Sequence, residues 1–370
     1  MKIDSAKVHE LRIPMETGGP HGWGKEEWKE FEFILLEVVT DEGLVGWGET
    51  WTYTDAPATA TALKSIILPQ ILGREVSGVA DFTADILNSN PVSKHGAPAI
   101  FAVSALDVAL WDISGKVAGE PLHRLLGGAR HERLPVFASF FRFDDPGLTA
   151  EMCSRALSEN MCWLKLHEIR LDCVRAAREA APNSTLILDV NGVWTPQEAV
   201  EQVRALQTYN LHWLEEPIHP VEDIESLALL KFADIPISVG EHAYTVDEFQ
   251  RIIDVGTVDI LQPGILKMGS INEVQRVLSL AAEKGAKAIP YTPFHGPALL
   301  ASLHLLATLQ EPTPVEFFYY TGIDGLIYGD TLTPKDGYLS VPQTPGLGYE
   351  PDPEVLSRFA VDYFEMSSYG

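Results

Sequence analysis

The sequence predicts an α/β fold: a modified (β/α)8 TIM barrel with an α+β capping domain formed by the N-terminal part and the C-terminal tail. Two observations lead to this prediction. The first 130 residues have the pattern of a small α+β unit, whereas from about residue 134 short apolar runs alternate with amphipathic, helix-like segments. Eight apolar runs have the character of buried parallel strands: 134–137, 162–166, 185–188, 211–214, 235–239, 258–261, 286–289 and 314–317.

The segments between the runs carry helix start and stop signals. Thr245 and Glu248 have the spacing of a capping box, as do Ser270 and Glu273, and the second of these helices is expected to end at Gly285. Strands that alternate with helices predict parallel βαβ units, and eight units predict closure into a barrel. A doubly wound open sheet is the structural alternative.

The N-terminal region has antiparallel features. Residues 31–40 resemble an edge strand of an antiparallel sheet followed by a turn, and helical patterns extend from about 58 to 127. The tail from about residue 335 is rich in proline and glycine, and we expect it to pack back onto this unit. The predicted domains are therefore a cap of residues 1–130, completed by 335–370, and a barrel of residues 131–334.

Composition limits the classes of function. Of the 370 residues, 46% are hydrophobic and 21% charged, and no run of about 18 apolar residues indicates a membrane span. The N-terminus lacks a secretory pattern and three sparse cysteines suit a reducing compartment, so we expect a cytoplasmic protein. A net charge of −25 disfavours nucleic acid and membrane surfaces as partners. A small anionic substrate would need local positive charge from a metal ion or a lysine.

Three acidic residues occur at regular intervals. Asp189, Glu215 and Glu241 are 26 residues apart in sequence, and each follows an apolar run. This interval equals one strand, one helix and two short loops, so a barrel would bring the three carboxylates to one rim, where they could bind a hard divalent cation. Three unrelated surface acids, among the 52 acidic residues of the chain, are the alternative.

Further polar side chains are expected at the same rim. Side chains two residues apart on a strand point to the same side, so Lys165 and His167 are expected to point the same way, as are Asp189 and Asn191. Glu316 lies within the last apolar run, and a buried lone acid is costly, so we expect it at the barrel mouth rather than in the wall. The alternative for His167 is a core histidine satisfied by hydrogen bonds.

The chain resembles the enolase superfamily, and within it the mandelate racemase and muconate lactonizing enzyme group. The resemblance covers nearly the whole length. It rests on the three acids and on four segments: Gly46-Trp-Gly-Glu49, Ala105 to Lys116, Leu125-Leu-Gly-Gly128 and Pro345-Gly-Leu-Gly348.

The resemblance implies one Mg²⁺ ion per chain on Asp189, Glu215 and Glu241, and abstraction of the proton α to a substrate carboxylate. It also implies that Lys165 holds that carboxylate and that His167 is the base. A histidine departs from the commoner lysine at this position, but imidazole ordinarily titrates near neutral pH.

The opposite side of the predicted site departs from the family. Racemases of this family carry an acid, and related members a lysine, at the end of the sixth barrel strand, where this chain has Gly264. The seventh strand offers Tyr291 or His295 as the general acid, and we favour His295. A loop histidine without a catalytic role is the alternative.

Five other residues complete the predicted site. His242 matches a Gly-Glu-His segment of acid-sugar dehydratases, although a strand neighbour of Glu241 would point away unless the strand has ended. Glu216 and Lys267 are expected to support the carboxylates from outside the metal ligands. His21 and Trp23 lie in a glycine-rich segment that matches the family's substrate-selecting loop, although an ordinary flexible turn fits equally well.

One base with a separate acid suits β-elimination, whereas racemisation needs a base on each face. The first hypothesis is therefore a magnesium-dependent lyase, an acid-sugar dehydratase acting on a small aldonate- or aldarate-like carboxylate. The alternatives are a racemase, epimerase or lactonizing enzyme of the same superfamily, and a non-catalytic metal-binding homologue. We expect a homo-oligomer, because similar proteins commonly form dimers or octamers.

Overall fold

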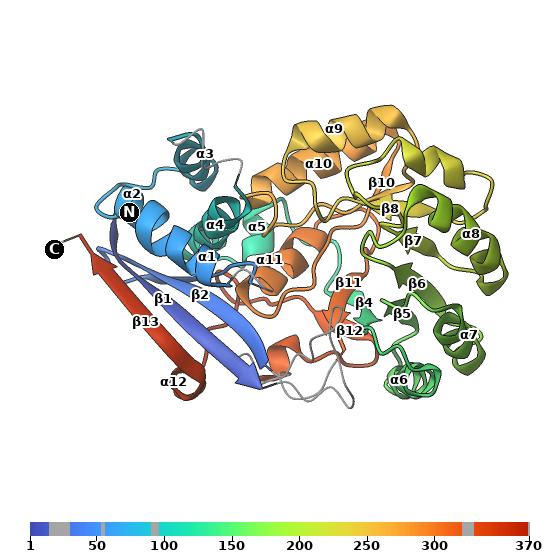
Figure 1. Ribbon diagram of the computed structural model, residues 1–370. Coiled ribbons are helices and arrows are strands. Elements are labelled where there is room, and N and C mark those ends of the chain that lie inside the picture. Colours follow the sequence, from blue (N-terminus) through green and yellow to red (C-terminus); the bar gives the residue numbers. More distant parts are fainter. Residues whose placement is uncertain (15–29, 53–55, 90–95, 320–328, 369–370) are drawn as a thin grey trace.

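The structure is a computed structural model that describes residues 1–14, 30–52, 56–89, 96–319 and 329–368. It contains a four-stranded antiparallel sheet at one end of the molecule and a curled parallel sheet surrounded by helices at the other (Figure 1). His21 and Trp23 lie outside the described residues.

The parallel sheet forms the modified (β/α)8 barrel. Its strands follow the order β10-β9-β8-β7-β6-β5-β4-β11, and neighbours in this order pair in parallel. The strands are β4 (Arg133–Ser139), β5 (Trp163–Leu166), β6 (Thr185–Asp189), β7 (Trp213–Glu215), β8 (Ile237–Val239), β9 (Ile260–Leu261), β10 (Lys287–Ala288) and β11 (Val315–Phe318). Each predicted apolar run overlaps one of them. The sequential order, with β11 beside β4, is that of the predicted parallel barrel and not of a doubly wound open sheet.

Helices cover the outside of the barrel. Two βα units depart from the regular pattern: the one after β7 has only the 3-10 segment η4 (Ser226–Leu230), and among the described residues no α-helix lies between β11 and β12. The barrel is therefore a modified one. The barrel helices are α6 (Pro146–Ser158), α7 (Leu171–Ala180), α8 (Pro196–Leu206, continued by η3, Gln207–Tyr209), α9 (Val246–Val255), α10 (Ile271–Lys284) and α11 (Pro297–Leu306).

The predicted helix signals are found with one difference. Thr245 and Glu248 form both bonds of a capping box at the start of α9. At α10 the Ser270 hydroxyl accepts the Glu273 N–H at 3.2 Å, but the Glu273 carboxylate pairs with Arg276 at 2.7 Å, so this cap is only half of a box. Gly285, at φ +71°, ends α10 in the left-handed conformation that glycine adopts readily.

The cap combines both ends of the chain. Its sheet has the order β13-β1-β2-β3, so the C-terminal strand pairs with the N-terminal one. The strand predicted over 31–40 is present, but its predicted edge position is wrong, because β2 pairs with β1 on one side and β3 on the other. The strands are β1 (Ile3–Pro14), β2 (Glu30–Thr40), β3 (Val45–Glu49) and β13 (Ala360–Ser367). The predicted division of the chain at residue 130 stays a prediction.

Helices fill the predicted helical region of the cap, and a short strand joins the tail to the barrel. Strand β12 (Tyr338–Ser340) pairs antiparallel with β4. The other elements are α1 (Ala56–Ala62), η1 (Leu63–Ile67), α2 (Leu68–Ile71), α3 (Val79–Ser89), α4 (Ala97–Ala118), α5 (Leu122–Leu125), η5 (Gly329–Leu332) and α12 (Pro353–Phe359).

Helix α4 is the core of the cap. It is the one helix of the described residues that is long and apolar enough to cross a membrane, but 78% of its apolar window is buried in the fold, as in a core helix. Strand β3 lies directly on it, because a Cβ at Gly46 would be 2.2 Å from the Ala109 carbonyl oxygen and one at Gly48 would be 1.9 Å from that of Ala105. The two glycines of the Gly-Trp-Gly-Glu segment therefore permit a close backbone contact.

The barrel interior is layered. Its lower layer is apolar, with Phe137, Ile187, Trp213, Ile260 and Ile289 packed into one buried cluster. Because side chains alternate along a strand, the residues two positions further on point into the barrel above this layer. These are Ser139, Asp189, Glu215, Gln262 and Tyr291, and they form the floor of the site.

Candidate active site

The three regularly spaced acids come together at the C-terminal ends of adjacent strands. Asp189 and Glu215 are the last residues of β6 and β7 and are register partners in the sheet, and Glu241 follows two residues after the end of β8. All three are buried, with 1%, 0% and 7% of their surface exposed. The interval in the sequence thus corresponds to three successive βα units of the barrel.

Lys165 lies within this group of acids. Its Nζ is 2.9 Å from Asp189 Oδ2, 2.7 Å from Glu215 Oε1 and 3.1 Å from Glu316 Oε1. Burial lowers the pKa of Lys165, but the carboxylates of Asp189, Glu215 and Glu316 outweigh burial and raise it well above its ordinary value. Lys165 is therefore an ammonium that can hold negative charge.

His167 faces the same acids, as the strand alternation predicts. Its Nε2 lies 3.3 Å from Asp189 Oδ2, and its Nδ1 makes a close contact with the Phe140 carbonyl oxygen. Because a carbonyl only accepts hydrogen bonds, Nδ1 carries the hydrogen and Nε2 is the nitrogen that can take a proton. The side chain is held by the fold, but it presents a basic nitrogen to the mouth of the barrel.

Asn191 and Glu316 border the acids. The Asn191 N–H donates to Asp189 Oδ1 at 2.9 Å. Glu316 accepts from the Ser139 hydroxyl at 2.8 Å, and its own N–H donates to Thr292 Oγ1 at 2.7 Å. This is the mouth of the barrel, where Glu316 was expected, and not the barrel wall.

The donor set fits a divalent cation. Burial, and then the charge of Asp189, raise the pKa of Glu215 well above its ordinary value, because one lysine does not neutralise the carboxylates around it. Within the described ranges, Glu316 Oε2 is buried and accepts no hydrogen bond. Crowded carboxylates, and a buried oxygen that lacks a hydrogen-bond donor, are what a hard cation with oxygen ligands requires.

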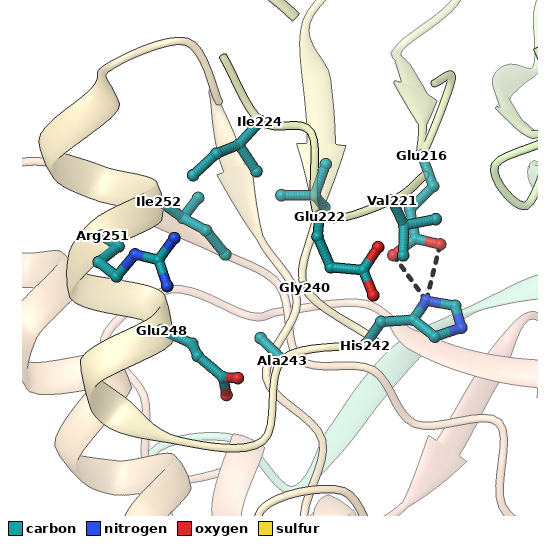
Figure 2. Close-up of a pocket in the computed structure, with 11 residues that line it drawn as sticks. Glu216, Val221, Glu222, Ile224, Gly240, His242, Ala243, Glu248, Arg251 and Ile252 are labelled. Carbon is teal, nitrogen blue, oxygen red and sulfur yellow. Dashed lines mark hydrogen bonds and ion pairs between the residues drawn. The ribbon is translucent and has the colours of Figure 1, made fainter. Parts of the chain in front are cut away.

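Glu216 and His242 form a second polar pair beside the acids. His242 Nδ1 lies 2.9 Å from Glu216 Oε2 (Figure 2). Strand β8 ends at Val239, so His242 turns toward the same side as Glu241, with its Nδ1 3.6 Å from Glu241 Oε1. Burial raises the pKa of Glu216 to about 7, and the charge of Glu241 acts in the same direction. Burial lowers the pKa of His242, but its bond to Glu216 and the charges of Glu241 and Glu216 raise it to about 9.

The pair borders a small cavity. A space of about 100 Å³ lies between the 221–224 loop and α9, lined by apolar side chains such as Ile224 and Ile252 and bordered by His242, Glu222 and Arg251 (Figure 2). Glu216 therefore links the metal-ligand candidates to the outer part of the barrel, and His242, with 43% of its side chain exposed, reaches solvent.

Comparison with known proteins identifies the family. Residues 149–355 match the model of the enolase C-terminal domain-like family, and residues 9–127 match that of the mandelate racemase / muconate lactonizing enzyme N-terminal domain. The first match alone covers more than half of the chain. This protein belongs to the mandelate racemase and muconate lactonizing enzyme family of the enolase superfamily. It is an enzyme of that superfamily, as the resemblance predicted.

Its relatives are dehydratases and isomerases. The chain is 28% identical to the arabinonate dehydratase of Saccharolobus solfataricus, over 86% of this chain and 88% of that one. It is 27% identical to the D-galactarolactone cycloisomerase of Agrobacterium fabrum, over 97% and 99%. A mandelate racemase/muconate lactonizing protein from Paracoccus denitrificans, solved with magnesium, superposes with a TM-score of 0.84 at 26% identity, covering 99% of this chain and 98% of that one.

The other half of this enzyme's barrel mouth is aromatic. Gly264 follows β9, and Tyr291 follows β10 with its ring centroid 5.5 Å from that of Trp51 in the cap. The Nζ of Lys267 lies 4.1 Å from the Trp51 ring centroid. The expectation that Lys267 supports the carboxylates stays a prediction. Its charge reaches His242 and opposes the rise in the pKa of that residue.

His295 lies outside the group of acids. Its ring packs against Phe31, at 4.1 Å between centroids, and stacks on Phe318 at 5.4 Å. The backbone N–H of His295, not its ring, donates to the buried carboxylate of Glu49 at 3.0 Å. Burial lowers the pKa of His295 to about 3, so the ring is neutral at pH 7. This weighs against our prediction that His295 is the general acid.

Sequence reasoning missed several residues that shape the site. Trp51 covers the aromatic half, Trp213 Nε1 donates to Glu215 Oε2 at 3.0 Å, and Arg142 Nε donates to the His167 carbonyl at 2.7 Å. Ser139 had a usable signal, because it is the last polar residue of an apolar strand. Trp51 had a weaker one, two residues after the Gly-Trp-Gly-Glu segment, and Arg142 had none that distinguishes it from other surface arginines.

Proposed function

We propose that this enzyme is a magnesium-dependent acid-sugar dehydratase, which removes the α-proton of a hydroxycarboxylate and eliminates the β-hydroxyl group. The observation that carries the proposal is the asymmetry of the barrel mouth. His167 and Lys165 supply a base and a cation on one side, whereas Gly264 removes the usual acid or lysine from the other. One base suits elimination better than racemisation, which needs a proton acceptor on each face.

Asp189, Glu215 and Glu241 would hold the magnesium ion. When bound, the ion supplies positive charge where the substrate carboxylate becomes more negative as its α-proton leaves. The burial of all three ligands makes this charge effective, because water does not screen it. The magnesium in the Paracoccus denitrificans structure supports this choice of metal.

The residues of the chain perform the remaining steps. Lys165 binds the substrate carboxylate, and His167 Nε2 removes the α-proton. Asn191 and Glu316 orient the substrate at the mouth, and Glu216 holds His242 in place beside it. The hydroxyl group leaves from the β-carbon with a proton delivered from the side opposite His167, and the resulting enol tautomerises to a 2-keto-3-deoxy acid.

The proposed substrate class is a small aldonate- or aldarate-like carboxylate. The relatives named for arabinonate and D-galactarolactone support this class, because both names refer to sugar acids. His21 and Trp23 remain candidates for substrate selection. Cytoplasmic localisation and homo-oligomeric assembly stay predictions.

An isomerase is the second candidate, since the cycloisomerase relative covers 97% of this chain and Tyr291 provides a hydroxyl on the second face. A racemase, an epimerase and a lactonizing enzyme belong to the same alternative. Family membership and the assembled acids, lysine and histidine disfavour a non-catalytic metal-binding protein.

Incubation with magnesium in deuterated water separates these functions. A panel of aldonates and aldarates is added, and products are identified by nuclear magnetic resonance and mass spectrometry. A dehydratase gives a 2-keto-3-deoxy acid, and an isomerase gives an α-deuterated epimer or a lactone. Epimer without any keto acid from every substrate would overturn the dehydratase proposal.

A further inference from the structure

Lys267 lies on the side of the barrel opposite the base. It belongs to the turn after β9, where its N–H donates to the Gly264 carbonyl at 3.0 Å. In the strand order, β9 is four positions from β5, the strand that carries Lys165 and precedes His167. In a barrel of eight strands, four positions separate opposite walls. A substrate between these walls would have His167 on one face and the β9 turn on the other.

The ammonium group of Lys267 is held by aromatic rings. Its Nζ lies 4.1 Å from the Trp51 ring centroid and 5.5 Å from those of Phe101 and Tyr291. The residue is 4% exposed. Cation–π attraction offsets part of the cost of burying the charge, and the rings limit where the ammonium can move. The cap contributes Trp51 and Phe101, so cap and barrel together fix its position.

Gly264 makes room for this arrangement. A Cβ added there would be 3.1 Å from Tyr291 Cδ1 and 3.4 Å from Lys267 Cγ. The Tyr291 ring and the Lys267 stem therefore border the space that a side chain at Gly264 would otherwise fill. The family's acidic or basic group is missing at this place, but a lysine three residues later supplies a cation next to it.

We propose that Lys267 is the proton donor to the departing β-hydroxyl group, on the face opposite His167. This inference rests on the proposed dehydratase function. His167 Nε2 takes the α-proton, the electron pair of the C–H bond forms the double bond between the α- and β-carbons, and the β-carbon–oxygen bond breaks. The hydroxide leaves with one proton from Lys267 as water. The enol takes a proton at the β-carbon when it becomes the keto acid, and solvent exchange restores Lys267 and His167 to their starting protonation states.

The two-sided arrangement determines stereochemistry. A base and an acid on opposite faces remove the proton and the hydroxyl in an anti elimination. Sugar acids whose α-hydrogen and β-hydroxyl can adopt the anti orientation, with the α-hydrogen toward His167, are thus the expected substrates. Their α-epimers are expected to be unreactive.

Lys267 is better suited to this step than its neighbours. An ammonium brings both a proton and a positive charge to the leaving oxygen, whereas the Tyr291 phenol brings only a proton. His295 is neutral at pH 7 and packs against Phe31 and Phe318. His242 is bound to Glu216 beside β8, one strand closer to the metal ligands.

The test compares Lys267→Met, Lys267→Arg and Tyr291→Phe in the magnesium-loaded enzyme, with Lys284→Met, an exposed lysine at the end of α10, as the matched control. Methionine keeps the length of the stem and arginine keeps the charge, but neither can donate the proton. We expect Lys267→Met and Lys267→Arg to dehydrate about 10³-fold more slowly than wild type. Recovered substrate should still exchange its α-proton in deuterated water, because His167 is intact. Lys284→Met should match wild type.

A β-fluoro analogue of the substrate separates acid catalysis from a structural role. Fluoride leaves without needing a proton, so Lys267→Met should eliminate fluoride within about tenfold of the wild-type rate. Two results would overturn the proposal: wild-type dehydration by Lys267→Met, or equal losses for the fluoro and hydroxy substrates. A larger loss in Tyr291→Phe than in Lys267→Met would also overturn it and assign the acid to Tyr291. If the wild-type enzyme neither exchanges the α-proton nor eliminates water, the proposed dehydratase function itself is wrong, and not only the role assigned to Lys267.

Discussion

The two halves of the barrel mouth differ in chemistry although both are built from the ends of parallel strands. The half at β5 to β7 is charged: Lys165 contacts Asp189 and Glu215 at 2.9 and 2.7 Å, and His167 contacts Asp189 at 3.3 Å. The half at β9 and β10 is aromatic, and its charge is the ammonium of Lys267 against Trp51. Under the proposed function, the charged half removes a proton and binds a cation, and the aromatic half encloses the substrate and stabilises the leaving group.

The loss of a metal ligand should have the largest effect. Replacing Glu215 with Gln removes one charge from the acids but keeps the size of the side chain, so we expect turnover to fall about 10⁴-fold and magnesium affinity to fall with it. Steady-state rates and calorimetric titration of Mg²⁺ measure the two effects. Glu283→Gln, on an exposed part of α10, is the control, and unchanged magnesium affinity in Glu215→Gln would remove the ligand assignment.

Replacement of the base comes next. His167→Asn retains a group that can donate to the Phe140 carbonyl but has no basic nitrogen, so turnover should fall about 10³-fold. In this variant α-proton exchange should be lost together with dehydration, in contrast to Lys267→Met. Nuclear magnetic resonance in deuterated water measures the rate of α-proton exchange. Preserved exchange would place the base elsewhere.

The aromatic half depends on an anchor in the cap, which predicts a dependence of stability on pH. The Glu49 carboxylate accepts the N–H groups of His295, Gly296 and Ala298 at 2.9–3.0 Å, at the start of α11. Burial raises the pKa of Glu49 to about 7, against a usual 4.5. The protonated form therefore gives stability that is fully present below about pH 4.5 and is lost as pH rises through about 7.

Glu49→Gln cannot titrate and should remove this dependence. Relative to the variant, the wild-type free energy of unfolding should decrease by about 3 kcal/mol between pH 4.5 and 7. Denaturant unfolding at several pH values measures the difference. Wild-type and variant profiles that run parallel across this range would show that Glu49 does not titrate as we infer.

The smallest expected effect is that of a methyl group at Gly264. In Gly264→Ala the new Cβ would lie 3.1 Å from Tyr291 Cδ1, so the ring must shift by a few tenths of an ångström. We expect dehydration to slow about fivefold, because a small displacement of the groups around Lys267 affects the proton transfer. Gly78→Ala is the control, since nothing lies within 4 Å of its added Cβ. Equal rates in both variants would show that the aromatic half tolerates the change.

The barrel and the charged half of the site could be predicted from the sequence. The eight apolar runs, the interval of the three acids and the alternation of Lys165 and His167 are local patterns, and the regular geometry of βα units and strands converts them directly into positions in space. For the same reason the carboxyl ends of adjacent strands had to meet, and Glu316 had to lie at the mouth. The resemblance to the superfamily was carried by the same residues.

The aromatic half and the pairing of the cap strands could not be predicted in this way, because they depend on contacts between distant parts of the chain. His295 was favoured as the acid, but its ring packs against Phe31 of the cap, and no local pattern predicts a contact between residues so far apart in the sequence. The contacts of Lys267, in the turn after β9, with the rings of Trp51 and Phe101 in the cap are likewise between residues far apart in the sequence. Strand β2 lies inside the sheet and not at its edge, because it pairs with β1 on one side and β3 on the other. The sequence of a strand does not show which other strands pair with it. Such contacts depend on how separate elements pack, and side-chain packing of this kind has no fixed spacing along the chain.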